Sequence, residues 1–134
     1  MQLLHTFLFL KKAVKKVLPA AALFFLQPLY SQHPDSIFIE NIYSNGWNHI
    51  NTNPDSVIFY FNKGKKQSEN SKFLSGLVMY HTYSAAYQIT LNQNKKALEH
   101  YDQAIEIAKK NNLPADLGSV YMKKGTLNLF PVFI

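Results

Sequence analysis

The strongest constraint on the fold is a three-residue pattern that recurs 40 positions further along the chain. In each copy an aromatic residue stands four positions after an apolar residue and three positions before a small one. The six positions are Val57, Phe61 and Gly64, followed at an offset of 40 by Ala97, Tyr101 and Ala104. Offsets of three and four place residues on one face of an α-helix. The small positions let another helix approach closely, and the ring fills the space between them. Each copy therefore predicts a helix that packs against a partner helix.

A second pattern recurs at a different offset. Tyr83, Ser84 and Tyr87 are followed, at an offset of 34, by Leu117, Gly118 and Tyr121. Two types of helix therefore alternate along the chain, and periods of this size are typical of helical-repeat arrays. The alternative is that any two amphipathic helices match at a few positions by chance. Small and aromatic residues recur in matching order in both patterns, and this favours a helical repeat over a chance match.

Helical periodicity and short polar connections divide the chain into helices without any strand. Asn53, Pro54 and Asp55 form a strong start signal, because Asn is a good N-cap and Pro suits the first helical position. Short connections make neighbouring helices antiparallel. The prediction is an all-α fold of antiparallel pairs with an unpaired last helix, and the expected ranges are 36–51 with 54–68, 72–92 with 95–110, and 114–127.

The N-terminal segment 1–31 has the order of a secretory signal. Two lysine pairs precede an apolar run from Val17 to Tyr30, and the small residue Ser31 follows. That run is shorter than the ~20 residues that span a bilayer as a helix. We expect a signal peptide or membrane-proximal segment over 1–31, with an uncleaved anchor as the alternative. The rest of the chain is then exported to the periplasm or cell envelope.

Composition excludes several classes of function. The chain has no cysteine, so a disulfide framework or thiolate metal site is impossible. Its 14 basic and 8 acidic residues give a net charge of +6, but four lysines lie in the predicted signal segment. The remaining net charge of about +2 does not indicate a basic surface that binds nucleic acid. The histidines lack metal-ligand spacing, and no hydrolase, phosphate-loop or metalloprotease motif occurs. We expect no enzyme activity and no cofactor.

The two patterns carry a family resemblance. The stretch Ala97 to Ala104 resembles the second-helix signature of the tetratricopeptide repeat (TPR) family, and Leu117 to Tyr121 resembles its first-helix signature. The resemblance implies a short α-solenoid of stacked helix pairs that follows a signal helix. The expected parts are a degenerate first repeat at 35–69, a second repeat at 71–111, and an incomplete third repeat with an apolar tail at 113–134.

The resemblance also implies a function. TPR arrays bind peptides in a concave surface lined by their first helices, so we expect a non-catalytic scaffold that binds a protein or peptide. The alternative is a truncated sensory region of a membrane signalling protein, either a histidine kinase or a transcriptional regulator. Counting from Ser84 and Gly118 gives the expected groove residues. They are His81, Gln88, Ser119, Met122 and Lys123.

The C-terminal part departs from a closed array. The third repeat lacks its second helix, and the chain continues into Phe130, Val132, Phe133 and Ile134. Repeat arrays normally end in a polar capping helix. We therefore expect a truncated version of a longer protein, with part of Tyr121 and Leu127 left uncovered and self-association through the C-terminal face.

Overall fold

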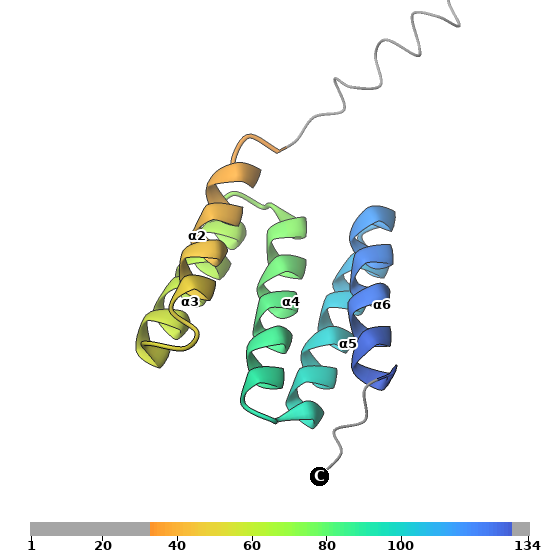
Figure 1. The fold of residues 1–134 in the computed structure, drawn as a ribbon. Helices are drawn as coiled ribbons and strands as arrows, with labels where there is room; N and C mark the ends of the chain where they lie inside the picture. Colours follow the sequence, from red (N-terminus) through yellow and green to blue (C-terminus); the bar gives the residue numbers. More distant parts are fainter. Residues whose placement is uncertain (1–32, 130–134) are drawn as a thin grey trace, which may run out of the picture. The chain divides into compact units, whose positions relative to one another are not determined.

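The computed structural model describes residues 33–129, and within this range the chain forms five α-helices and no strand (Figure 1). The predicted all-α class is confirmed. The helices are α2 (Ser36–Asn48), α3 (Pro54–Asn70), α4 (Leu74–Thr90), α5 (Asn94–Lys110) and α6 (Pro114–Leu129). The predicted export segment at 1–31 and the tail from Phe130 lie outside the described residues. None of the described helices is both long and apolar enough to cross a membrane.

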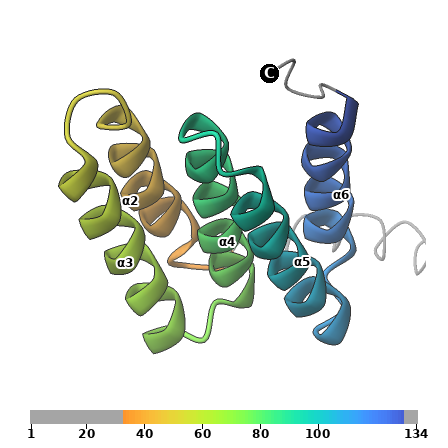
Figure 2. The same cartoon turned by 90° about the horizontal axis from the view of Figure 1, so that it is seen from below.

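The helices follow one another as antiparallel neighbours, the general packing of a helical repeat (Figure 2). α4 is central, because it packs against α2, α3, α5 and α6. α3, α4, α5 and α6 begin at positions 54, 74, 94 and 114, so successive starts are equally spaced. Two helices with their turns therefore make one structural repeat, and equivalent positions in successive repeats differ by 40 in the numbering, as Pro54 and Asn94 do.

Three turns in the array share one backbone geometry. The residue two positions after the helix end lies in the left-handed region at Lys72, Asn92 and Asn112, with φ of 55°, 56° and 52°. After α3, the amide of Phe73 donates to the carbonyl of Ser68, and the amide of Lys72 donates to that of Glu69. This pair of bonds is the Schellman motif, and the same bonds close the turns after α4 and α5. Identical turns explain why the equal spacing of the helix starts is kept.

The first hairpin, α2 with α3, is joined differently. Asn53 caps α3 by accepting a hydrogen bond from the amide of Ser56, and Pro54 occupies the first helical position. This cap confirms the start signal read from the sequence. The connection before it runs from His49 to Asn53 and is longer than the other three turns, which span Ser71–Phe73, Leu91–Gln93 and Asn111–Leu113.

The core of the first hairpin is aromatic. Ile39, Tyr43, Val57, Phe61 and Tyr87 are buried together. Rings reach this density because glycine lies opposite them: a Cβ added at Gly64 would lie 2.5 Å from the Tyr43 ring, and one at Gly46 would lie 2.8 Å from Phe61. Neither position tolerates a side chain without displacement of a ring.

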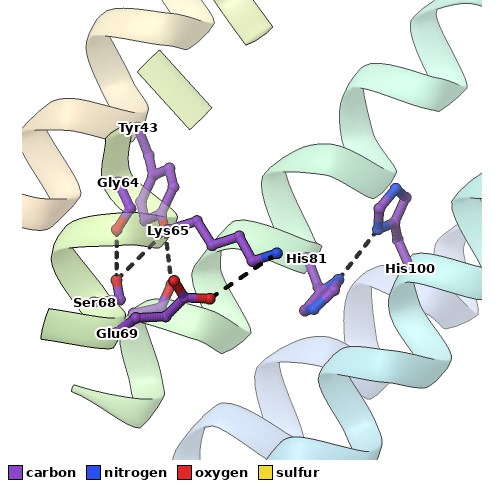
Figure 3. A network of polar contacts seen from close by, with 8 residues as sticks. Tyr43, Gly64, Lys65, Ser68, Glu69, His81 and His100 are labelled. Carbon is purple, nitrogen blue, oxygen red and sulfur yellow. Dashed lines mark hydrogen bonds and ion pairs between the residues drawn. The ribbon is translucent and has the colours of Figure 1, made fainter. Parts of the chain in front are cut away.

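A polar contact also closes this core. The Tyr43 hydroxyl donates to the carbonyl of Gly76 at 2.9 Å and lies 3.5 Å from the Ser68 hydroxyl (Figure 3). Ser68 donates to the carbonyl of Gly64. Burial raises the pKa of the Tyr43 phenol, so the hydroxyl keeps its proton and acts as a donor. Tyr43 therefore ties α2 to α3 and α4.

The core of the second hairpin, α4 with α5, is built from small and aliphatic side chains around one ring. The members of this cluster are Val78, Ala85, Ala97, Tyr101, Ala104, Ile105, Ala108 and Val120. Its four alanines are at most 1% exposed. Val120 joins from α6, so the cluster continues into the last helix.

Candidate functional site

The clearest hollow in the described residues lies along the first helices of the repeats. Two adjoining hollows of about 160 and 360 Å³ share Thr82, Tyr83 and Lys123 in their walls. We call this continuous depression the groove. The remaining lining residues are Glu40 and Trp47 from α2, Val78, Met79 and Ala86 from α4, Tyr101 from α5, and Asp116, Ser119, Val120 and Thr126 from α6.

The aromatic wall of the groove is held rigidly. The Tyr83 ring stacks on Tyr43 with centroids 5.4 Å apart, and Trp47 meets Tyr83 edge-on at 6.1 Å. Phe61 also contacts the Tyr83 ring, at a tilt and with the ring centroids 5.8 Å apart. Because Tyr43 is fixed by its hydrogen bond to Gly76, Tyr83 and Trp47 are already placed before anything binds. Preorganised aromatic groups of this kind bind a partner with little loss of side-chain entropy.

The polar groups of the groove divide between its two ends. The smaller hollow has two carboxylates, Glu40 and Asp116, and one amine, Lys123. Asp116 accepts a 2.6 Å hydrogen bond from the Ser75 hydroxyl, which fixes its orientation. The larger hollow has Lys123 as its only charged residue, with Trp47, Tyr83 and Tyr101 around it. One end therefore suits a polar or basic side chain, and the other suits an apolar one.

The structure brings some of the expected groove residues to the groove and not others. Ser119 and Lys123 line it. Met122 points away on α6 and is 68% exposed. His81 instead contacts His100 of α5, and Gln88 lines a separate hollow on the other side of α4.

The difference comes from helix phase. The sequence offset of 34 pairs Ser84 with Gly118, whereas the structural offset of 40 pairs Tyr83 with Lys123 and Met79 with Ser119. A difference of six positions turns the inferred face of α4 by about 240°, at 100° per residue. Met79 and Tyr83 do line the groove. The polar turns at 92–94 and 111–114 place Asn92 and Asn112 20 positions apart, which is half of the longer offset, and this spacing is its sequence signal.

The expected packing residues fall into two groups. Ser84, Tyr87, Ala97, Tyr101 and Ala104 are buried, and Tyr83 is half-buried in the groove wall. The three positions on α6 differ. Leu117 packs against the second core, but Gly118 and Tyr121 are exposed.

Two histidines that are distant in sequence meet between α4 and α5. The Nδ1 atoms of His81 and His100 are 3.2 Å apart, so one ring donates a hydrogen bond to the other (Figure 3). Burial, with smaller contributions from His100 and Lys65, lowers the pKa of His81 to about 4. Burial also lowers the pKa of His100, against an opposing effect of Glu99. No group of three or more potential metal ligands occurs in the part of the chain that the structure describes.

A third hollow of about 320 Å³ lies on the opposite side of α4, between α3 and α5. Its walls include Tyr80, Gln88, Gln93 and His100. The Oε1 atoms of Gln88 and Gln93 are buried without a hydrogen-bond partner among the described residues. Phe61, Tyr80 and Tyr87 also line this hollow, but it lacks the tryptophan and the two carboxylates of the groove, and the groove is the stronger candidate.

Comparison of the chain with protein-family models, curated protein sequences and solved structures gives no significant match. The geometry of the groove is therefore the feature from which a function is inferred.

Proposed function

We propose that this chain is a non-catalytic helical-repeat scaffold of the TPR type, which binds a segment of another protein in the groove. The observation that carries the proposal is the fixed aromatic wall of Trp47 and Tyr83 at the centre of a depression formed mainly by α2, α4 and α6. Tryptophan and tyrosine in central pockets supply much of the binding energy at protein interfaces. Repeat arrays use extended concave surfaces in this way.

The side chains at the two ends of the groove restrict which peptide sequences it can bind. The larger hollow, with Trp47, Tyr101 and the wall of Tyr83, fits an apolar or aromatic side chain. Glu40 and Asp116 at the smaller hollow favour a basic or neutral side chain over an acidic one. Ser119 and Thr126 provide hydroxyls at the rim that hydrogen-bond to a peptide backbone. The proposed ligand is thus an extended segment with an apolar anchor residue next to a basic one.

Trp47 makes this proposal directly testable, because it is the only tryptophan in the chain and it lines the groove. A peptide-display library is selected against the full chain, and the selected peptides are titrated while tryptophan emission is recorded. We expect saturable changes in emission and selection of apolar residues next to Lys or Arg. Tyr83→Ala should weaken binding by at least tenfold, because it removes the central wall.

A matched control is available on the other side of α4. Lys96→Ala changes an exposed residue that lines the third hollow and should leave binding unchanged. Peptides that bind wild-type and Tyr83→Ala chains equally, or that are lost with Lys96→Ala, would place the binding site elsewhere.

The proposed location is outside the cytoplasm, on the basis of the order of residues 1–31. A reporter fused after residue 34 should be carried into the periplasm or cell envelope and processed near Ser31. A reporter that stays in the cytoplasm with the fusion intact would contradict export.

A further inference from the structure

The described residues contain three buried side-chain atoms that lack a hydrogen-bond partner in the protein, and all three lie beside the turn from α4 to α5. They are the Oε1 atoms of Gln88 and Gln93 and the Oδ1 atom of Asn94. Buried polar atoms in proteins are almost always paired, because an unpaired one destabilises the fold. The stretch 88–94 therefore holds hydrogen-bonding capacity that the described residues leave unused.

The same turn occurs twice more in the array, with different residues at these positions. Gln88 and Gln93 are joined through the main chain, because the amide of Gln93 donates to the carbonyl of Gln88. The pairs joined in the same way are Ser68 with Phe73 and Ala108 with Leu113. In both of these pairs the second residue is apolar and packs against a core, in keeping with the apolar contacts that accompany Schellman turns. The turn after α4 has two amides instead, and a departure of this kind from a local rule is expected at a functional site.

Both glutamines line the third hollow, between α3 and α5. Its volume of about 320 Å³ is at the lower end of the range for small-molecule sites. Phe61, Tyr80 and Tyr87 give it an aromatic wall. The last torsion of a glutamine side chain is broad, so either end of each amide can be turned toward a molecule in the hollow. The hollow therefore combines apolar surface with two adaptable hydrogen-bonding groups.

The charges around the hollow favour an uncharged ligand. Lys96 lines it and is exposed, and no carboxylate of the described residues occurs in its lining. Burial lowers the pKa of His100, so this ring is neutral near neutral pH. A cation would meet Lys96 without a compensating acid, and an anion would bring more acceptors to two oxygens that already lack donors. Hydroxyl groups suit the site, because each can donate one hydrogen bond and accept others.

We propose that the third hollow binds a neutral sugar ring. The sugar hydroxyls donate to the amide oxygens of Gln88 and Gln93 and accept from the Lys96 ammonium. The C–H face of the ring packs on the aromatic wall, since aromatic rings carry negative potential on their faces. The site lies on the other side of α4 from the groove, so it is separate from the peptide site and does not depend on the function proposed there.

The test measures sugar binding to the full chain by isothermal titration calorimetry. The probes are glucose, galactose, mannose and N-acetylglucosamine, with maltose and lactose as two-ring forms. We expect saturable binding of at least one of them. The double variant Gln88→Ala with Gln93→Leu copies the residues of the turn after α5 and should weaken that binding at least tenfold. Because it removes two unpaired buried amides, it should unfold at the same or a higher urea concentration than wild type.

A matched control is Gln103→Leu, which makes the same kind of change at an exposed residue of α5 outside the three hollows. It should leave sugar binding unchanged. Glucosamine, a cation near neutral pH, and glucuronate, an anion, should both bind more weakly than the neutral sugars. Absence of saturable binding by every probe to the folded chain would overturn the proposal. Equal binding to wild type and the double variant, or a preference for either charged sugar, would overturn it as well.

Discussion

The two hairpins of this array fill their cores with different distributions of side-chain volume. In α2 with α3, large rings pack onto glycine, and the Tyr43 hydroxyl adds a buried hydrogen bond. In α4 with α5, alanine replaces glycine and fewer rings are needed. Because protein interiors are close-packed, the side chains that face one another across a hairpin must together fill the space between its two helices. A substitution is therefore tolerated or not according to which hairpin contains it.

The largest effect is expected from removal of a ring in the first hairpin. Phe61 is buried and contacts Tyr43, Tyr83 and Tyr87. Phe61→Ala should lower the free energy of unfolding by about 3–5 kcal/mol, because it removes apolar contacts and leaves a cavity. Urea unfolding followed by circular dichroism measures this. Phe59→Ala, at a side chain that is 62% exposed, is the control and should change stability by no more than ~0.5 kcal/mol.

The next effect tests the difference between the hairpins directly. Gly64→Ala places a Cβ 2.5 Å from the Tyr43 ring and should destabilise the chain by about 1–3 kcal/mol through overpacking. Gly125→Ala, at an open position of α6, should instead stabilise it by about 1 kcal/mol through helix propensity. Both free energies of unfolding come from urea titration. If Gly64→Ala is neutral, the first hairpin is less tightly packed than its rings indicate.

A smaller effect concerns the pH dependence of stability, to which His81 in the second hairpin contributes. The pKa of His81 is lowered to about 4 in the folded chain, from the ordinary 6.5. The unfolded chain therefore binds more protons, and stability falls as pH drops from about 6.5 toward 4. After allowance for partial exposure, His81 contributes a loss of about 1–3 kcal/mol. His81→Asn should flatten the dependence of urea stability on pH over this range. An unchanged slope in His81→Asn would assign the pH dependence to other groups.

The smallest effect concerns a turn. Lys72 occupies a left-handed position that Asn92 and Asn112 fill in the other two turns. Asparagine visits this region more readily than lysine, so Lys72→Asn should raise the free energy of unfolding by about 0.5–1 kcal/mol. Thermal unfolding by circular dichroism detects the gain. Asn92→Lys should produce a loss of similar size, and a change of the same sign in both variants would contradict this account.

Much of the fold was predictable because its signals are local. Asn53 with Pro54 marks a helix start, and the spacing of Ala97, Tyr101 and Ala104 identifies a buried helix face; all three are buried in the structure. The predicted helix 36–51 ends earlier, at Asn48. That end has no glycine or proline at the boundary, so the residues there carry no stop signal.

The groove was harder to predict, because its lining depends on the rotation of each first helix. Tyr83, Ser84 and Tyr87 match Leu117, Gly118 and Tyr121 in residue type, but the turns fix a longer structural offset. The contact of His81 with His100 depends on the same rotation, so sequence spacing alone does not indicate it.

The three identical turns have a consequence for how such a chain can change length. Each helix with its turn is one unit of constant length, and the groove is built mainly by alternate units: α2, α4 and α6. Whether a helix is odd or even in the order of the array therefore decides which of its sides faces the groove. Duplication of two units adds one more helix to the groove and keeps every inner residue inside. Duplication or loss of a single unit would exchange inner and outer roles for every helix beyond it, so viable length variants of this array should differ by whole pairs of units.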